Sequence, residues 1–181
     1  VGVTKTMEVN QHRTWAEIDL GAIEHNYRVI CEQAQAPVLC VVKADAYGHG
    51  AVQCAKIMHA TGADMFAVAT VSEGVQLREG GIKSPILVLN EPPIDACDTL
   101  LEYQIMPSVY SSEFALAYGE RAVEMGCVGK YHMAIETGMN RIGVHFTDVL
   151  EFRREIDFHR GIECDGVFTH FATADDPDGW D

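Results

Sequence analysis

The stretch that decides the fold is residues 38–50, which read VLCVVKADAYGHG. It opens with an apolar run, residues 38–42, of the kind that forms a buried parallel strand. Lys43 follows this run directly. In parallel α/β folds, functional sites are built at the carboxyl ends of the strands. The stretch therefore predicts a strand that delivers a lysine to a site, although from the residues alone a surface or salt-bridged lysine is the commoner outcome.

The same alternation of a short apolar run and a longer amphipathic segment continues along the chain. Further strands are predicted at residues 65–69, 86–89, 105–109, 131–135 and 166–170, and an edge-like segment at residues 14–19 precedes them all. Helices are predicted at residues 21–34, 51–61, 70–79, 113–125 and 148–157. Their expected start signals are Asp19, Ser72, Ser111 or Ser112, and Thr147. The chain is therefore expected to have an α/β fold.

Two architectures fit such a series, an open doubly wound sheet and a (β/α)₈ barrel, and periodicity alone does not separate them. Six strands are too few to close an eight-stranded barrel. If the fold is a barrel, two strand positions lie beyond Asp181 and one sheet edge is exposed.

Composition narrows the class of protein. The chain has 181 residues, of which 48% are hydrophobic and 22% are charged, which indicates one compact domain. The formal net charge is −14 and the basic residues are scattered, so neither a nucleic acid nor an anionic membrane is an expected partner. An anionic cofactor remains possible, because a phosphate site needs only a few local donors.

Cysteine spacing and hydropathy bear on the compartment. The six cysteines lie far apart and form no CxxC pair, which fits a reducing cytoplasm. Residues 1–10 lack the apolar core of a signal peptide, and no apolar run approaches the roughly 20 residues that span a bilayer. We therefore expect neither secretion nor membrane insertion.

Two later blocks carry polar residues after predicted strands. Residues 136–143 read ETGMNRIG, and Arg141 could point its guanidinium at an anionic oxygen or make a surface ion pair. Residues 166–175 read GVFTHFATAD, and His170 could serve a site or be a hydrogen-bonded core residue. Asp175 and Asp176 add metal-ligand types, but no recognised motif brings further ligands to them, so no metal site is expected.

Residues 41–50 resemble the pyridoxal-phosphate attachment motif of alanine racemases, VVKA-AYGHG. Residues 13–20, RTWAEIDL, and the two later blocks resemble the same family, so the resemblance runs from about residue 14 to 176. It implies a pyridoxal-phosphate-binding (β/α)₈ TIM-type barrel, the family's N-terminal domain, with about six of eight βα units present. Residues 1–12 are then an N-terminal extension of a partial domain at 1–181. The last barrel strands and a C-terminal β domain are then absent.

The resemblance also implies roles for individual residues. Lys43 matches the catalytic lysine, which bonds to the aldehyde of pyridoxal 5′-phosphate as a Schiff base and serves as one of two acid/bases. Tyr47 matches the tyrosine that reaches the cofactor phosphate, and Arg141 the arginine that donates to its phenolic oxygen. His170 matches the histidine that packs against the pyridine ring. The expected apolar wall has two weaker candidates, Val41 and Leu89.

Two positions depart from the family pattern. A lysine that braces the arginine is frequent where this chain has Ala134, and an aspartate is commoner than Glu136. Arg141 must therefore be positioned by another group, with Glu136, an ion or water as the alternatives.

The resemblance implies a racemase that interconverts L-alanine and D-alanine and supplies D-alanine for bacterial cell-wall peptidoglycan. The family works as a homodimer whose partner subunit contributes a catalytic tyrosine. Because that tyrosine and the later strands are not in this chain, we expect little or no activity from these 181 residues alone. The alternatives are a serine or broad-specificity amino-acid racemase, and a non-enzymatic pyridoxal-phosphate-binding barrel.

Overall fold

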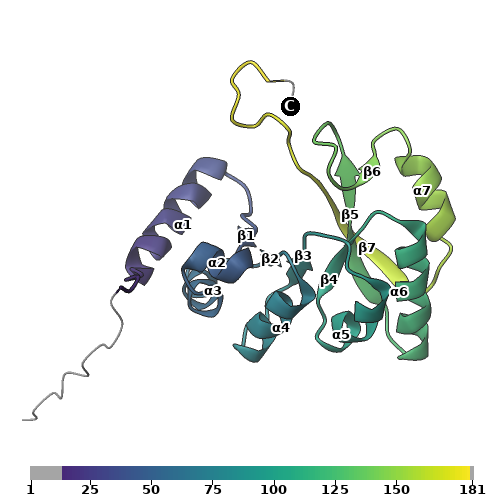
Figure 1. Cartoon of the computed structure of the whole chain (residues 1–181), viewed down its shortest axis with the longest axis horizontal. Helices are drawn as coiled ribbons and strands as arrows, with labels where there is room; N and C mark the ends of the chain where they lie inside the picture. Colours follow the sequence, from purple (N-terminus) through teal and green to yellow (C-terminus); the bar gives the residue numbers. More distant parts are fainter. Residues whose placement is uncertain (1–13, 180–181) are drawn as a thin grey trace, which may run out of the picture.

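The computed structural model describes residues 14–179, in which short parallel strands alternate with helices (Figure 1). The strands are β1 (Cys40–Val41), β2 (Phe66–Val68), β3 (Ile86–Val88), β4 (Met106–Val109), β5 (Gly129–Glu136), β6 (Val144–His145) and β7 (Ile162–Thr169). The helices are α1 (Leu20–Ala34), α2 (Lys43–Gly48), α3 (Ala51–Ala60), α4 (Val71–Glu79), the 3₁₀ turn η1 (Ile94–Ala96), α5 (Cys97–Glu102), α6 (Ser112–Glu124) and α7 (Val149–Ile156).

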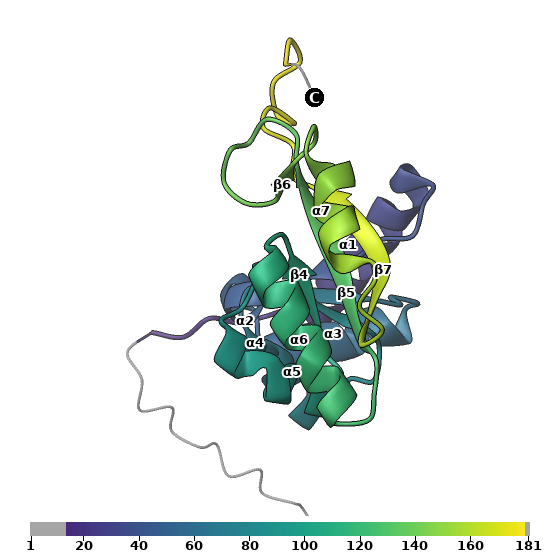
Figure 2. The same ribbon diagram turned by 90° about the vertical axis from the view of Figure 1, so that its right-hand side faces the viewer.

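The sheet follows chain order. Strands β1 to β5 are neighbours in sequence order, every pairing is parallel, and β7 pairs with β5 along its length (Figure 2). The six predicted strands correspond to β1 to β5 and β7, and β6 is a two-residue addition that pairs with the end of β5. The α/β class and the incomplete barrel are confirmed. No further strand pairs with β7 within residues 14–179, and its Val167 is 58% exposed, as expected of an open edge.

Both faces of the sheet are apolar. In β2, Phe66 and Val68 belong to the large core between the sheet and its helices, whereas Ala67 belongs to a smaller cluster on the opposite face. That inner cluster also contains Leu87 and Met106. Because strand residues alternate between faces, burial on both sides requires an uninterrupted apolar run. This is why β2 and β3 are continuous apolar segments, whereas β7 alternates exposed and half-buried residues.

Helix starts agree with the sequence in part. Asp19 and Ser111 cap α1 and α6 as predicted, each accepting a backbone N–H with its side chain. The prediction was wrong at α4, where Thr70 rather than Ser72 is the cap, because Thr70 and Glu73 form a reciprocal capping box. It was also wrong at α7, which begins after Asp148 without a side-chain cap bond.

The predicted edge-like segment at residues 14–19 is wrong as well, because these residues form no strand. An extended segment becomes a strand only when a neighbour pairs with its backbone, and no part of residues 20–179 does so here. Among the helices of the described region, none combines the length and apolar character needed to cross a bilayer.

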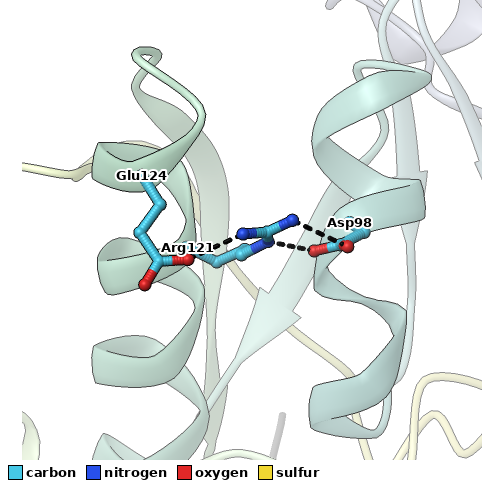
Figure 3. A network of polar contacts seen from close by, with 3 residues as sticks. All are labelled: Asp98, Arg121 and Glu124. Carbon is cyan, nitrogen blue, oxygen red and sulfur yellow. Dashed lines mark hydrogen bonds and ion pairs between the residues drawn. The ribbon is translucent and has the colours of Figure 1, made fainter.

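Two arginines link neighbouring elements of the fold. Arg121 of α6 forms a bidentate ion pair with Asp98 of α5 and a 2.7 Å contact to Glu124 (Figure 3). Arg78 of α4 makes no ion pair within residues 14–179. Its guanidinium donates instead to four backbone oxygens at 2.7–2.9 Å, those of Ile82, Ser84, Tyr103 and Gln104. Arg78 thereby ties together the loops that enter β3 and β4.

Candidate active site

The predicted site residues lie just beyond the carboxyl ends of the strands. Lys43 follows β1 after one residue and is half-buried, and its side chain makes no hydrogen bond or ion pair within residues 14–179. Tyr47 lies in the turn after it, is 62% exposed, and also has no hydrogen-bond partner in that range. Both polar groups are therefore available to a ligand.

The turn after Lys43, which is the element labelled α2, has an uncommon backbone conformation. Ala44, Asp45, Ala46 and Tyr47 have φ between 50° and 54° and ψ between 37° and 50°, so four consecutive residues are left-handed. For residues other than glycine this conformation costs about 1–2 kcal/mol each. Backbone strain of this kind persists only where the surroundings enforce it, and it clusters at functional sites. The sequence did not predict this turn, because none of the four is glycine or asparagine.

Two carboxylates make hydrogen bonds at the left-handed turn and just after it. The backbone N–H of Ala44 donates to Oε1 of Glu73 at 2.7 Å, a contact between residues 29 positions apart. Asp45 Oδ1 accepts from the backbone N–H of Ala51 at 2.7 Å, at the start of α3. The first bond restrains the peptide that joins Lys43 to Ala44, and the second links the turn to the start of α3.

Arg141 and His170 lie close together several strands away from Lys43. They line one small pocket at the carboxyl ends of β5 and β7, together with Ala134, Glu136 and Phe168 among others. The structure therefore brings these two predicted residues together. Lys43 and Tyr47 do not line this pocket. Lys43 and Tyr47 lie at the same, carboxyl edge of the parallel sheet as this pocket, but β2, β3 and β4 separate β1 from β5.

Glu136 organises the loop that presents Arg141. Its Oε2 accepts from the backbone N–H of Arg141 at 3.2 Å, and its Oε1 accepts from the N–H of Gly138. Hydrogen bonds from the backbone of Asn140 and Gly138 lower the pKa of the buried Glu136 carboxyl. The Arg141 guanidinium makes no hydrogen bond or ion pair within residues 14–179, so it too is available to an anion.

The two apolar candidates occupy the inner face of the sheet. Val41 is in register with Ala67 of β2, which is in register with Leu87 of β3. Leu89 follows β3 and packs against the inner cluster. Val41 is 38% exposed, so its side chain can still contact a ligand.

Two glutamates at this end of the sheet were missed by sequence reasoning. Glu73 lies in a Thr-x-x-Glu pattern, which is a known helix-start signal, but nothing in that pattern indicates the contact to Ala44. Glu91 accepts from the backbone N–H groups of Tyr110 and Ser111 at 2.6 and 2.8 Å and so fixes the loop after β4. Within residues 14–179, no three acidic, histidine or cysteine side chains are grouped as metal ligands.

The parallel strands follow one another in chain order around an inner apolar cluster, which is the arrangement of an α/β barrel. The available polar groups lie beyond the carboxyl ends of these strands, at the mouth of the barrel, where such proteins have their sites. The family model for the N-terminal domain of alanine racemase matches residues 18–180. The chain belongs to the alanine racemase family. The family is pyridoxal-phosphate-dependent, and its members are isomerases.

Curated relatives agree with this assignment. The alanine racemase of Carboxydothermus hydrogenoformans is 45% identical over 165 residues, which are 91% of this chain and 45% of the relative. That of Halothermothrix orenii is 39% identical, over 91% of this chain and 44% of the relative. The chain thus spans less than half the length of the curated relatives it matches.

Solved structures confirm the barrel. An alanine racemase of Clostridium difficile 630, in complex with cycloserine, superposes with a TM-score of 0.86 at 39% identity, over 91% of this chain and 46% of that one. A histidine racemase from Leuconostoc mesenteroides superposes with a TM-score of 0.83 at 30% identity, over 90% of this chain and 44% of that one. Members that differ in substrate therefore share this half of the fold.

Proposed function

We propose that this chain supplies the pyridoxal-phosphate-binding part of an alanine racemase. The reaction is the interconversion of L-alanine and D-alanine, which supplies D-alanine for cell-wall peptidoglycan. The observation that carries the proposal is the half-buried residue Lys43, whose amine has no partner within residues 14–179 and which follows the carboxyl end of β1 in a chain of this family.

The residues at the mouth fit pyridoxal 5′-phosphate chemically. The cofactor combines an aldehyde, a phosphate, a phenolic oxygen and an apolar ring, and the mouth offers a primary amine, a hydroxyl, a guanidinium and an imidazole, all available in the described region. Lys43 would hold the aldehyde, Tyr47 the phosphate and Arg141 the phenolic oxygen. Packing against the ring is assigned to His170, Val41 and Leu89.

Racemisation needs a proton acceptor and donor on each face of the substrate Cα. The bound cofactor supplies an electron sink that stabilises the carbanion at this carbon. Lys43 takes or returns the proton on one face. Tyr47 is assigned to the phosphate, so the opposite face requires a further group.

We assign that further group to a tyrosine of the partner subunit in a homodimer. In this proposal, residues 1–181 are a partial N-terminal barrel domain with an extension at 1–12. We also propose a cytoplasmic location. All six cysteines are free and Cys127 is exposed, which suits a reducing compartment.

Cofactor attachment can be tested on the 181-residue chain. Titration with pyridoxal 5′-phosphate should produce the visible absorbance band of a cofactor bonded to an amine, and borohydride reduction followed by peptide mass spectrometry should place the adduct on Lys43. Lys43→Ala should abolish both signals. Lys56→Ala, which removes an exposed lysine of α3, is the matched control and should retain them. An adduct distributed over several lysines would contradict the proposal.

Racemase activity is tested on the entire open reading frame that contains this chain. Conversion of L-alanine to D-alanine, followed by chiral chromatography, should depend on added cofactor and on Lys43. Residues 1–181 alone should show little or no conversion. Cofactor bonding to the whole protein without exchange of the alanine Cα hydrogen in heavy water would favour a non-enzymatic barrel.

A broad-specificity racemase is the second candidate. The similarity to a histidine racemase at 30% identity favours it, because the half of the fold that this chain covers is shared by racemases named for alanine and for histidine. A panel of L-alanine, L-serine and L-histidine offered to the whole protein distinguishes them. Alanine as the best substrate supports the first proposal, and comparable rates with all three support the second.

A further inference from the structure

Glu73 contacts two elements of the barrel mouth at once. It is the third residue of α4, and its Oε2 accepts from the backbone N–H groups of Ala69 and Thr70 at 2.8 and 3.1 Å. These bonds complete the capping box of its own helix. The other oxygen, Oε1, is not needed for the cap, and it accepts from the backbone N–H of Ala44 at 2.7 Å.

Ala44 directly follows Lys43, so its N–H belongs to the peptide that joins the two residues. A bond to this N–H fixes the orientation of that peptide plane, and with it the direction in which the Lys43 side chain leaves the backbone. Ala44 is also the first of the four left-handed residues. Because an L-residue does not favour this conformation, the start of the turn needs an external partner to remain in it.

We propose that Glu73 is a positioning residue for Lys43, which it directs toward the mouth of the barrel by holding the Ala44 amide. This inference rests on the proposed function and adds to its site a carboxylate from the start of α4. The carboxylate is the suitable group, because each of its oxygens accepts N–H donors, and it makes the stronger, charge-assisted bond with them. A glutamine has only one such oxygen, and its NH₂ group would face an N–H donor.

The test separates positioning from helix capping with paired variants. Glu73→Asp should lose the contact to Ala44 because its side chain is one CH₂ group shorter, and Glu73→Gln should weaken it because its single oxygen cannot serve both Ala44 and the capping box. Thr70→Ala removes the other half of the capping box and leaves the Glu73–Ala44 bond in place. Stability to urea, amide hydrogen exchange of Ala44 by NMR, and the affinity of Lys43 for pyridoxal 5′-phosphate are measured for each chain.

We expect the Glu73 variants to increase the exchange rate of the Ala44 amide and to weaken cofactor bonding by about tenfold each, as the loss of one charge-assisted hydrogen bond implies. Thr70→Ala should lose comparable stability but leave both quantities within about twofold of the parent chain. Glu73→Asp keeps the acid in the first turn of α4, so it provides the test if Glu73→Gln does not fold.

Two results would overturn the inference. One is unchanged Ala44 exchange and cofactor affinity in folded Glu73 variants, and the other is an equal change in Thr70→Ala. The exchange measurement needs no cofactor, so it tests the positioning even if the chain does not bond pyridoxal 5′-phosphate. Failure of Lys43→Ala to abolish the adduct would refute the proposed function instead, because that variant leaves the Glu73 contact intact.

Discussion

Oε2 of Glu136 lies 3.2 Å from the backbone nitrogen of Arg141, and this carboxylate holds the arginine through its main chain rather than through its guanidinium. The departure at Ala134 required some other group to position Arg141, and Glu136 is the one that contacts it. The loop between them is closed by the same carboxylate through Gly138. The guanidinium itself makes no ion pair in the described region, so it remains available to an anionic ligand.

Glu136→Gln should destabilise the chain at neutral pH, because the carboxylate accepts several backbone N–H groups of its loop. The pKa of Glu136 is lowered in the folded chain from its ordinary 4.5, so its contribution to stability is fully present above that value. It is lost as the pH falls from there through the lower folded pKa. Urea unfolding followed by circular dichroism should show the difference from the parent chain shrinking over this acid range. Glu120→Gln, an exposed glutamate of α6, should show no such trend.

Gly143→Ala should disrupt the same loop. Gly143 has φ of 109°, and an added Cβ would lie 2.7 Å from the backbone nitrogen of Glu136 and 2.9 Å from the carbonyl carbon of Ile135. Gly126→Ala is the matched control, because φ is 71° there but no atom lies within 4 Å. We expect Gly143→Ala to lose about 2 kcal/mol more than the control in urea unfolding. Equal losses would mean that the loop moves aside at little cost.

Ala44→Gly should stabilise the chain by up to about 1 kcal/mol, because glycine adopts the left-handed conformation without the penalty that alanine incurs. Ala22→Gly, at an exposed position in the right-handed helix α1, should instead lose about 0.5–1 kcal/mol. Differential scanning calorimetry of the two variants checks the opposite signs. A loss of stability in both would show that the turn is not left-handed in solution.

Arg78→Met should lose roughly 2–4 kcal/mol, because four loop carbonyls are left without their shared donor. Burial lowers the pKa of Arg78, and the acceptors are neutral, so this loss should be nearly independent of salt. Arg121→Met is the comparison, because it removes an exposed ion pair with Asp98 (Figure 3). Its effect should be smaller than that of Arg78→Met and should decrease at high salt. Urea unfolding at two ionic strengths distinguishes the two arginines.

The sequence predicted the six barrel strands from short runs rich in apolar residues, which are uninterrupted in β2 and β3 because both faces of those strands are buried. It also predicted the polar ends of these strands, including Lys43, Arg141 and His170, from short motifs. It missed α5, a helix of six residues, and β6, a pair of residues, because elements this short carry no measurable periodicity. It also predicted an edge-like segment at residues 14–19, with which no strand of residues 20–179 pairs.

The sequence by itself determined which residues form the strands. It also determined that Lys43 follows the first strand, because both are properties of consecutive residues. The left-handed turn after Lys43, the hold of Glu73 on Ala44 and the pocket shared by Arg141 and His170 were decided only by the tertiary structure. Each of these depends on which strands are neighbours in the sheet. A hydrogen bond between residues 29 positions apart has no local pattern. It forms because the parallel sheet brings the ends of β1 and β2 side by side.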